Sequence, residues 1–376
     1  MRLILFALSA STLYVIWYFA VANGLLAQND IVVASGKLPG TNEPLRTSYT
    51  GIEPVDRLLT LLTIFFYPAL DGQSPGLLVH SLGFSGTFGA AWTLVVLESW
   101  RKGNAGTIAA YPMLFGLAAQ LLTFACSAPL FLGLHLGSSI TARQPRADNI
   151  SVPRAVLATL PLIFLVGYQA PSIAMALPAP RVLSSDWKQI AIAIWQPWPA
   201  YVSIMTTVAY HLVSPLLPDN PRASMSALRW VYATALATAG LAHLVSWVIP
   251  LASVVAPVLF KDRFLAGLHP SNVFQIPIPW SGVQVQSVAE GVHYFLRWDY
   301  LIGSAGTLLW ASKLYTVAHK QILRTVSLTG LVVKIVLLSI IVGPTGAAVE
   351  LVWERDELVF KETGGSRQVS SMKKSS

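Results

Sequence analysis

One aspartate in an apolar stretch of the sequence, Asp299, has no adjacent partner for its charge. It lies in HYFLRWDYLIGS, residues 293–304, at the start of an otherwise apolar segment. Arg297 is two residues away, and at about 100° per residue of helix the two side chains point to nearly opposite sides. Arginine can extend its guanidinium toward the preceding loop, whereas aspartate is too short to reach water from within a membrane. We therefore expect Asp299 to be paired, hydrogen-bonded or protonated, and to have a functional role.

A carboxylic acid that stays neutral in apolar surroundings can protonate an epoxide or an alkene. The carbocation that results is stabilised by the π faces of aromatic side chains, provided that water is excluded. The sequence supplies 12 Trp, 12 Tyr and 15 Phe. The residues that we expect to bind a substrate near such an acid are Tyr67, Trp92, His80, Trp298 and Tyr300. This chemistry requires neither a metal nor a cofactor.

Sequence motifs for metal-dependent or nucleotide-dependent chemistry are missing. There is no GxxxxGK[ST], GxGxxG or HExxH, and no histidine pair at helical spacing with a carboxylate. The aspartate-rich DDxxD, the DxDD of soluble protonating cyclases and the paired aspartate motifs of membrane prenyltransferases are also absent. The single cysteine, Cys126, can form neither an intrachain disulfide nor a CxxC metal site. We therefore predict a protein that uses no metal and no cofactor.

The composition is typical of a polytopic membrane protein. Hydrophobic residues make up 54% of the chain and charged residues only 11%, against roughly 25% in soluble domains. The 25 Lys and Arg outnumber the 17 Asp and Glu, but these bases lie in short loops and in the C-terminal tail. No basic run is interleaved with aromatic residues, so we expect membrane lipid rather than nucleic acid as a partner.

Eight segments have the roughly twenty mostly apolar residues that a membrane-spanning helix needs. They are 3–27, 76–98, 107–134, 154–177, 189–214, 227–257, 294–312 and 325–350. A shorter run, 56–70, is either a ninth span or one limb of a re-entrant hairpin. The sequence therefore predicts an all-α transmembrane bundle of about eight or nine spans. We expect residues 1–353 to form a single integral-membrane domain, with the first segment as an uncleaved anchor.

The C-terminal residues 354–376 are expected to form a disordered basic tail. The distribution of Lys and Arg between the loops favours a cytosolic position for this tail. The last four residues, KKSS, resemble the dilysine signal that returns membrane proteins to the endoplasmic reticulum. We therefore expect a multi-pass protein of the endoplasmic reticulum membrane.

Four further carboxylates lie at the ends of apolar segments: Glu53 and Asp56 in YTGIEPVDRLL, Asp71 in FFYPALDGQSPG, and Glu98 in WTLVVLESWRKGN. Each also has an ordinary structural explanation. Glu53 and Asp56 suit a helix start, where carboxylates are favoured. Asp71 suits a turn, although a helix break at this depth is tolerated only where it lines a cavity. Glu98 is spaced for an ion pair with Arg101.

Three stretches of the sequence resemble a known family. YTGIEPVDRLLTLLTIFFYPALDG, FGAAWTLVVLESWRKGN and HYFLRWDYLIGS are similar to the fungal membrane-bound terpene cyclases of the ascofuranone and macrophorin pathways, which make meroterpenoids. The resemblance covers about residues 49 to 305. It implies a class II type cyclisation, in which protonation rather than diphosphate loss starts ring closure. The substrate would be a farnesyl chain on a phenol or related polyketide core, often with a terminal epoxide.

The resemblance also indicates which acids to expect at the site. Asp71, Glu98 and Asp299 lie in the matching motifs, with Glu53 and Asp56 as second choices. Asp299 or Asp71 would donate the first proton. A second carboxylate such as Glu98, or a histidine such as His80, would accept the last one.

Two other functions remain open from the sequence alone. One is a transporter or exporter of a hydrophobic metabolite, in which Asp299 and the mid-segment Lys334 of GLVVKIVLL would form a proton-coupled pair. The two halves of the chain show no repeat, which many transporters have. The other is a polytopic scaffold without chemistry, in which every intramembrane acid could be changed to an amide without loss.

Overall fold

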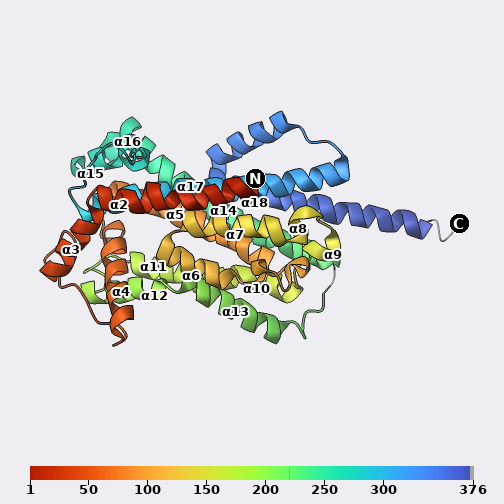
Figure 1. Ribbon diagram of the computed structural model, residues 1–376, viewed down its shortest axis with the longest axis horizontal. Coiled ribbons are helices and arrows are strands. Elements are labelled where there is room, and N and C mark those ends of the chain that lie inside the picture. The colour runs from red at the N-terminus through yellow and green to blue at the C-terminus, as the bar shows by residue number, and fades with distance from the viewer. Residues whose placement is uncertain (220, 373–376) are drawn as a thin grey trace.

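The computed structural model describes residues 1–219 and 221–372, and all of the regular elements within these ranges are helices, as predicted. An isolated bridge between Lys37 and Pro44 is the one pairing of extended residues found there. Figure 1 shows an elongated bundle, with α3 and α4 at one end and the C-terminal part of α18 projecting from the other. The KKSS sequence, residues 373–376, lies outside the described residues.

Five long helices form the body of the bundle, and shorter helices complete it. The long ones are α1 (Arg2–Thr12), which continues through a π-helical stretch (Leu13–Tyr18) into α2 (Phe19–Ala22), α5 (Pro75–Ser99), α14 (Pro221–Val255), α17 (Val288–Leu323) and α18 (Leu328–Met372). The shorter ones are α3 (Leu25–Ser35), α4 (Glu53–Phe66), α6 (Pro112–Leu122), α7 (Phe124–Ser138), α8 (Ile140–Arg143), α9 (Ala147–Ile150), α10 (Arg154–Phe164), α11 (Ala170–Ala176), α12 (Ser185–Trp195), α13 (Trp198–Val213), α15 (Asp262–Leu268) and α16 (Pro270–Phe274).

Helix α5 is the central helix of the bundle, and almost all of its residues from Gly86 to Ser99 are buried. Small residues let its neighbours approach closely, because a side chain at Gly86 would collide with Ala242 of α14. A similar close approach joins α17 to α7, since the ring of Phe124 occupies the space beside Gly303. The second contact fixes the start of α7 against α17.

Four helical stretches are long and apolar enough to cross a membrane among the residues described: Arg2–Ala22, Arg154–Ala176, Ser224–Val255 and Leu328–Glu362. This is fewer than the eight or nine spans predicted. The predicted span 107–134 divides into α6 and α7 at Thr123, and 189–214 divides into α12 and α13 before Pro197, so each piece is too short. Exposed apolar side chains along α14 and α18, such as Leu241 and Ile340, are compatible with membrane insertion.

Arg297 lies on α17 and binds the segment that follows α15. Its guanidinium is buried and donates hydrogen bonds to the carbonyl oxygens of Val273 (3.1 Å), Gln275 (2.7 Å) and Asn272. These carbonyls lie at the C-terminal end of α16, where no intrahelical donor is available. The side chain of Arg297 thus extends to the preceding loop, as expected, but it is enclosed by protein.

Helix α18 is kinked at Gly343, which has a φ of 78°, and at the following Pro344. Proline has no N–H, so the carbonyl of Ile340 loses its helical donor. His243 of α14 replaces that donor, with 3.1 Å between its Nε2 and the Ile340 oxygen. His243 therefore has a structural role at a helix contact.

The boundary that we expected between domain and tail lies inside α18. The helix continues through residue 354, and Arg355, Asp356 and Val359 are buried. Arg355 and Asp356 form ion pairs with residues at the end of α5, which gives this part of the chain fixed partners inside the bundle.

Candidate functional site

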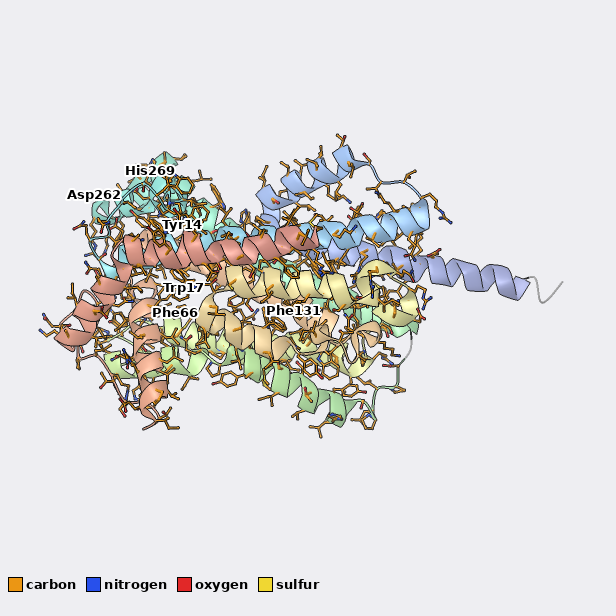
Figure 2. The ribbon with its side chains drawn as sticks, viewed as in Figure 1. Tyr14, Trp17, Phe66, Phe131, Asp262 and His269 are labelled. Carbon is orange, nitrogen blue, oxygen red and sulfur yellow. The ribbon has the colours of Figure 1, made fainter. Side chains whose placement is uncertain are left out.

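A cavity of ≈ 760 Å³ lies among α3, α4, α5, α6, α11, α12 and α17. Its volume is within the range of roughly 300–1,000 Å³ that is usual for sites of small organic ligands. The aromatic residues of its wall are Trp17, Phe65, Phe66, Phe84, Phe88, Phe124, Tyr168, Trp195 and Phe295. Figure 2 labels two of these residues, Trp17 and Phe66, which lie close together beside the top of α4.

Most polar groups of the aromatic wall have partners within the wall itself. The Tyr168 hydroxyl donates to the Ser85 carbonyl oxygen (2.6 Å), and the Trp195 indole N–H donates to Ser172 Oγ (2.8 Å). These contacts direct the polar atoms of Tyr168 and Trp195 away from the enclosed space. The interior is therefore largely apolar and suited to a hydrocarbon chain.

Asp299 lines this cavity and is only 4% exposed. Its Oδ1 accepts a hydrogen bond from the backbone N–H of Ala125 (2.5 Å), and the Phe124 amide and the Thr123 hydroxyl also face the carboxyl group. The first amides of a helix have no intrahelical acceptor and prefer a carboxyl oxygen. Asp299 therefore caps the start of α7 from a different helix.

The acid reaches these amides because the chain breaks at Thr123, between α6 and α7. Thr123 has a φ of 111°, which is rare for a β-branched residue. Its Oγ1 accepts the N–H of Cys126 (3.1 Å), and the Trp17 indole donates to the Leu122 carbonyl oxygen (3.1 Å), so one open backbone group on each side of the break has a partner. In membrane proteins, irregular backbone is tolerated where it lines a cavity. Thr123 lies in the cavity wall.

Glu53 and Asp56 lie in the first turn of α4, outside the cavity wall. Glu53 is exposed. Asp56 is buried and accepts hydrogen bonds from the amides of Tyr49 (3.1 Å), Thr50 (2.7 Å) and Gly51 (3.1 Å), and from the Thr50 hydroxyl (2.8 Å). Asp56 thus fixes the loop that leads into α4.

The loop contacts of Asp56 predict a pH dependence of stability. The bond from the Thr50 amide, together with the other donors, lowers the pKa of Asp56 to about 2. A carboxyl group with a lowered folded-state pKa stabilises the fold above its unfolded pKa of about 4 and loses that effect as the pH falls toward 2. In detergent, the melting temperature of the wild type should therefore fall more steeply between pH 5 and pH 3 than that of Asp56→Asn. Parallel curves for the two proteins would contradict this assignment.

Asp71 lies in the turn after α4, and its Oδ1 accepts the N–H of Gln73 (2.8 Å). Burial raises the pKa of Asp71, and the nearby Lys188 ammonium opposes that rise. Lys188 is itself buried and donates to the carbonyl oxygens of Leu70 (2.7 Å) and Leu177 (2.9 Å). Leu70 lines the cavity and Asp71 does not, so this acid lies behind the wall.

Glu98 belongs to a buried ionic cluster that lies outside the cavity wall; the cluster consists of Glu98, Arg101, His135, Tyr232, Arg355 and Asp356. Glu98 Oε1 accepts from Arg101 (2.8 Å) and Arg355 (2.9 Å), and both arginines also pair with Asp356 (2.8 Å each). The expected pair of Glu98 with Arg101 is thus present, within a larger group. Two carboxylates balance two guanidinium groups.

His135 is part of the same cluster and is held in one tautomer. Its Nδ1 accepts the indole N–H of Trp310 (3.1 Å), so its Nε2 carries the hydrogen that it donates to Glu98 Oε2 (3.1 Å). The cluster joins α5, α7, α14 and α18, and the bond from Trp310 connects it to α17.

None of the five residues that we expected to bind substrate is part of the cavity wall, although two of them pack against it. Trp92 packs on Phe88, with ring centroids 5.9 Å apart, and Tyr300 packs on Phe84 at 6.4 Å. His80 contacts the Tyr300 ring at 5.7 Å. The two remaining residues are Tyr67, which is buried, and Trp298, whose indole donates to the Pro277 carbonyl oxygen (3.0 Å).

Sequence reasoning missed the aromatic residues that do line the cavity. Phe84 and Phe88 are four apart on α5, and Phe295 is four before Asp299 on α17, so each pair shares a helix face. That four-residue spacing was the signal in the sequence that could have identified these aromatic residues. Of the ten predicted site residues, Asp299 is the one that the cavity wall contains.

Lys334 is not the partner of Asp299. Its ammonium group binds both carboxylate oxygens of Glu354, at 2.6 Å each. The pair of Asp299 with Lys334, on which the proton-coupled transporter would depend, is therefore not formed. Among the described residues, no group of three or more His, Cys, Asp or Glu side chains is placed to hold a metal ion.

Comparison with known proteins shows close relatives over nearly the whole chain. The family model described as the CtvD domain matches residues 1–360. Terpene cyclase ctvD of Aspergillus terreus is 33% identical over 361 residues, which cover 94% of this chain and 98% of the relative. Terpene cyclase penA of Penicillium crustosum is 29% identical, covering 94% of each chain. Terpene cyclase ascI of Acremonium egyptiacum is 30% identical, covering 96% and 92%. No solved structure matches.

Proposed function

We propose that the chain cyclises a prenylated lipophilic substrate inside the aromatic cavity and that Asp299 starts the reaction. The proposal starts from the family, because the chain belongs to the CtvD-domain family of fungal terpene cyclases. The chain is a terpene cyclase of fungal secondary metabolism. The observation that carries the finer proposal is the position of Asp299, a buried carboxyl group in the wall of a large aromatic cavity. Asp30, the other carboxylate of the wall, is exposed.

The proposed reaction is an isomerisation in which one proton enters and one leaves. The Asp299 carboxyl group donates its proton to the oxygen of a terminal epoxide, or to a terminal alkene carbon. The C–O bond of the epoxide opens, and successive alkene π bonds attack the developing cation to close the rings. Transfer of a proton from carbon to the Asp299 carboxylate, directly or through water, ends the sequence, so the product has the formula of the substrate. Asp299 is protonated again when the next cycle begins.

The cavity supplies what such a cation needs. Aromatic faces attract a positive charge within about 6 Å of the ring centre, and an apolar interior excludes water that would quench it. Nine aromatic residues contribute to this wall. The residues present thus support a reaction without metal or cofactor, on a farnesylated phenol or a related polyketide.

Membrane location fits a lipophilic substrate. Several leucines of the cavity wall are also exposed on the molecular surface, including Leu58, Leu61 and Leu121. A prenylated molecule dissolved in the bilayer could enter between them. We propose that the enzyme is a multi-pass protein of the endoplasmic reticulum membrane with lipid as its surroundings.

A direct assay separates cyclisation from transport. Microsomes that contain the enzyme would be incubated with a farnesylated phenol bearing a terminal epoxide, in separate samples with and without EDTA, and without an energy source. We expect a cyclic product of the same mass as the substrate, detected by liquid chromatography and mass spectrometry, and none with microsomes that lack the enzyme. Redistribution of unchanged substrate would support a transporter, and loss of product on addition of EDTA would contradict metal independence.

A further inference from the structure

Gln120 of α6 faces the cavity. The cavity wall includes three consecutive residues of this helix, Ala119, Gln120 and Leu121. Consecutive residues point about 100° apart around a helix, so the middle one, Gln120, faces the cavity most directly. Gly116, one turn earlier, packs against Trp92, which keeps this side of α6 against the bundle. The side chain of Gln120 is therefore presented to a molecule in the cavity.

The side-chain amide of Gln120 makes no hydrogen bond with the residues that the structure describes, and the side chain is half-buried. Its polar atoms keep accessible surface, unlike the Oδ1 of Asn29 and the Oγ of Ser81, which are buried in the same wall without a partner. The other glutamine of the wall, Gln169, donates to the Thr238 hydroxyl (3.3 Å). Neither an apolar wall nor a lipid chain can pair with an amide, and an unpaired amide in such surroundings costs free energy. The Gln120 amide is therefore suited to bind a polar atom of a ligand.

Gln120 lies one helical turn from a residue that contacts the acid. Thr123 is three positions further on, a rise of about 4.5 Å at about 1.5 Å per residue, and residues at this spacing share one side of a helix. The bond from the Thr123 N–H to the Ala119 carbonyl oxygen (3.1 Å) keeps this turn helical. The Thr123 hydroxyl faces the carboxyl group of Asp299, and all three residues, Gln120, Thr123 and Asp299, line the cavity. The amide and the acid thus border the same part of the cavity, from α6 and from α17.

An epoxide matches this pair of groups, whereas an alkene does not. The epoxide oxygen has two lone pairs, so it can accept a hydrogen bond from the amide and the proton from the carboxyl group. The amide keeps its own hydrogens throughout. The proton of Asp299 moves to the oxygen as the C–O bond breaks, and the hydroxyl group that forms stays beside Gln120. An alkene has no oxygen to accept the hydrogen bond, so it would leave the amide of Gln120 unpaired.

We propose that the Gln120 amide donates a hydrogen bond to the oxygen of a terminal epoxide and holds that oxygen beside Asp299. Gln120 is then the residue that selects an epoxidised prenyl chain over the same chain with a terminal alkene. This inference rests on the proposed function, and it specifies which group of the substrate Asp299 protonates.

Binding can be measured without turnover in the Asp299→Asn protein, which serves as the parent. The probes are a farnesyl phenol with a terminal epoxide and the same compound with a terminal alkene. The signal is quenching of tryptophan fluorescence, since Trp17 and Trp195 line the cavity. Adding Gln120→Met keeps the length of the side chain but removes the amide. We expect it to weaken epoxide binding about five- to tenfold, as one hydrogen bond allows, and to leave alkene binding unchanged.

Two features of this design isolate the Gln120 amide. Every protein compared carries the same substitution at position 299, so that position cannot account for a difference between them. Gln169→Met is the matched control, because it makes the same change at the other glutamine of the wall, whose amide is bonded to Thr238. This control should leave the ratio of the two affinities as it is in the parent.

The outcomes separate the two proposals. If Gln120→Met binds the epoxide as tightly as the parent does, the amide does not recognise the oxygen and this inference fails, although the proposed cyclisation stands. Equal loss of affinity for both probes would show a change in the shape of the cavity, and would likewise overturn a role in epoxide recognition. A selective loss of epoxide binding in Gln169→Met instead would place the oxygen at the wrong glutamine. If the wild type cyclises neither probe and the parent binds neither, the proposed function fails and the inference fails with it.

Discussion

Asp299→Asn should lower the rate of cyclisation by about 10²- to 10⁴-fold, the usual contribution of a general acid. Asparagine has an oxygen that can still accept the N–H of Ala125, so the cap on α7 is retained. Its amide has no proton acidic enough to open an epoxide or to protonate an alkene. The variant therefore removes the proton and keeps the structural contact. The measurement is product formed per amount of folded enzyme, with folding checked by the melting temperature.

Two further variants define what this result means. Asp262→Asn is a matched control, since Asp262 lies in the first turn of α15 and outside the cavity wall, and it should cyclise at the wild-type rate (Figure 2). Asp299→Ala removes both the proton and the cap, so it should also lower the melting temperature. A wild-type rate in Asp299→Asn would reduce Asp299 to a structural cap and would remove the basis of the proposed mechanism.

Glu98→Gln should destabilise the protein by roughly 3–5 kcal/mol, the usual cost of breaking a buried ion pair by removing one partner. Glutamine has nearly the same shape but no charge. The substitution would leave the buried guanidinium groups of Arg101 and Arg355 with Asp356 as their one carboxylate in the cluster. We expect a large fall in the melting temperature and in the yield of folded protein in detergent.

Glu357→Gln is the matched control for the ionic cluster. Glu357 pairs with Arg229 at 2.5 Å, but both side chains are partly exposed, at 37% and 55%. Ion pairs at such positions contribute about 0–1 kcal/mol, so this variant should melt close to the wild type. If Glu98 instead accepted the last proton of the reaction, Glu98→Gln would lower the rate per folded molecule with little change in melting temperature. That result would contradict a purely structural role.

The helical fold class and one residue of the candidate site were accessible from the sequence for a physical reason. An apolar stretch of about twenty residues strongly indicates a helix in a membrane, and a short carboxylic acid inside one is costly enough to be conspicuous. Asp299 was identified on that ground, and it lies in the cavity wall. The family was identified from three motifs and is confirmed by the relatives.

The break at Thr123 could not have been predicted in this way. The run LLTFAC around it contains neither glycine nor proline, the residues that usually mark a break. The break depends on tertiary contacts that sequence periodicity does not report, such as the Trp17 bond to Leu122 and the packing of Phe124 beside Gly303. The predicted span 107–134 was therefore wrong as one continuous helix.

The ionic cluster was hidden for a similar reason. Arg355 and Asp356 lie in a charged segment that resembles a solvated tail, and their partners Glu98 and Arg101 are more than 250 positions away in the sequence. The aromatic wall posed a different difficulty, because aromatic residues occur on several faces of α5. Periodicity groups Phe84 with Phe88, but it does not say whether that face or the face of Trp92 borders a cavity.

The cap that connects Asp299 to α7 has a consequence for how product diversity can arise in this enzyme. The N–H group that Asp299 contacts belongs to the main chain, which every residue except proline would supply at position 125. Side chains along the rest of the cavity can therefore change in size or shape without moving the acid. Natural variation or directed evolution at Phe65, Phe66 or Phe295 would alter how the chain folds before ring closure. Under the proposed mechanism, initiation and ring pattern are thus separable traits of one scaffold.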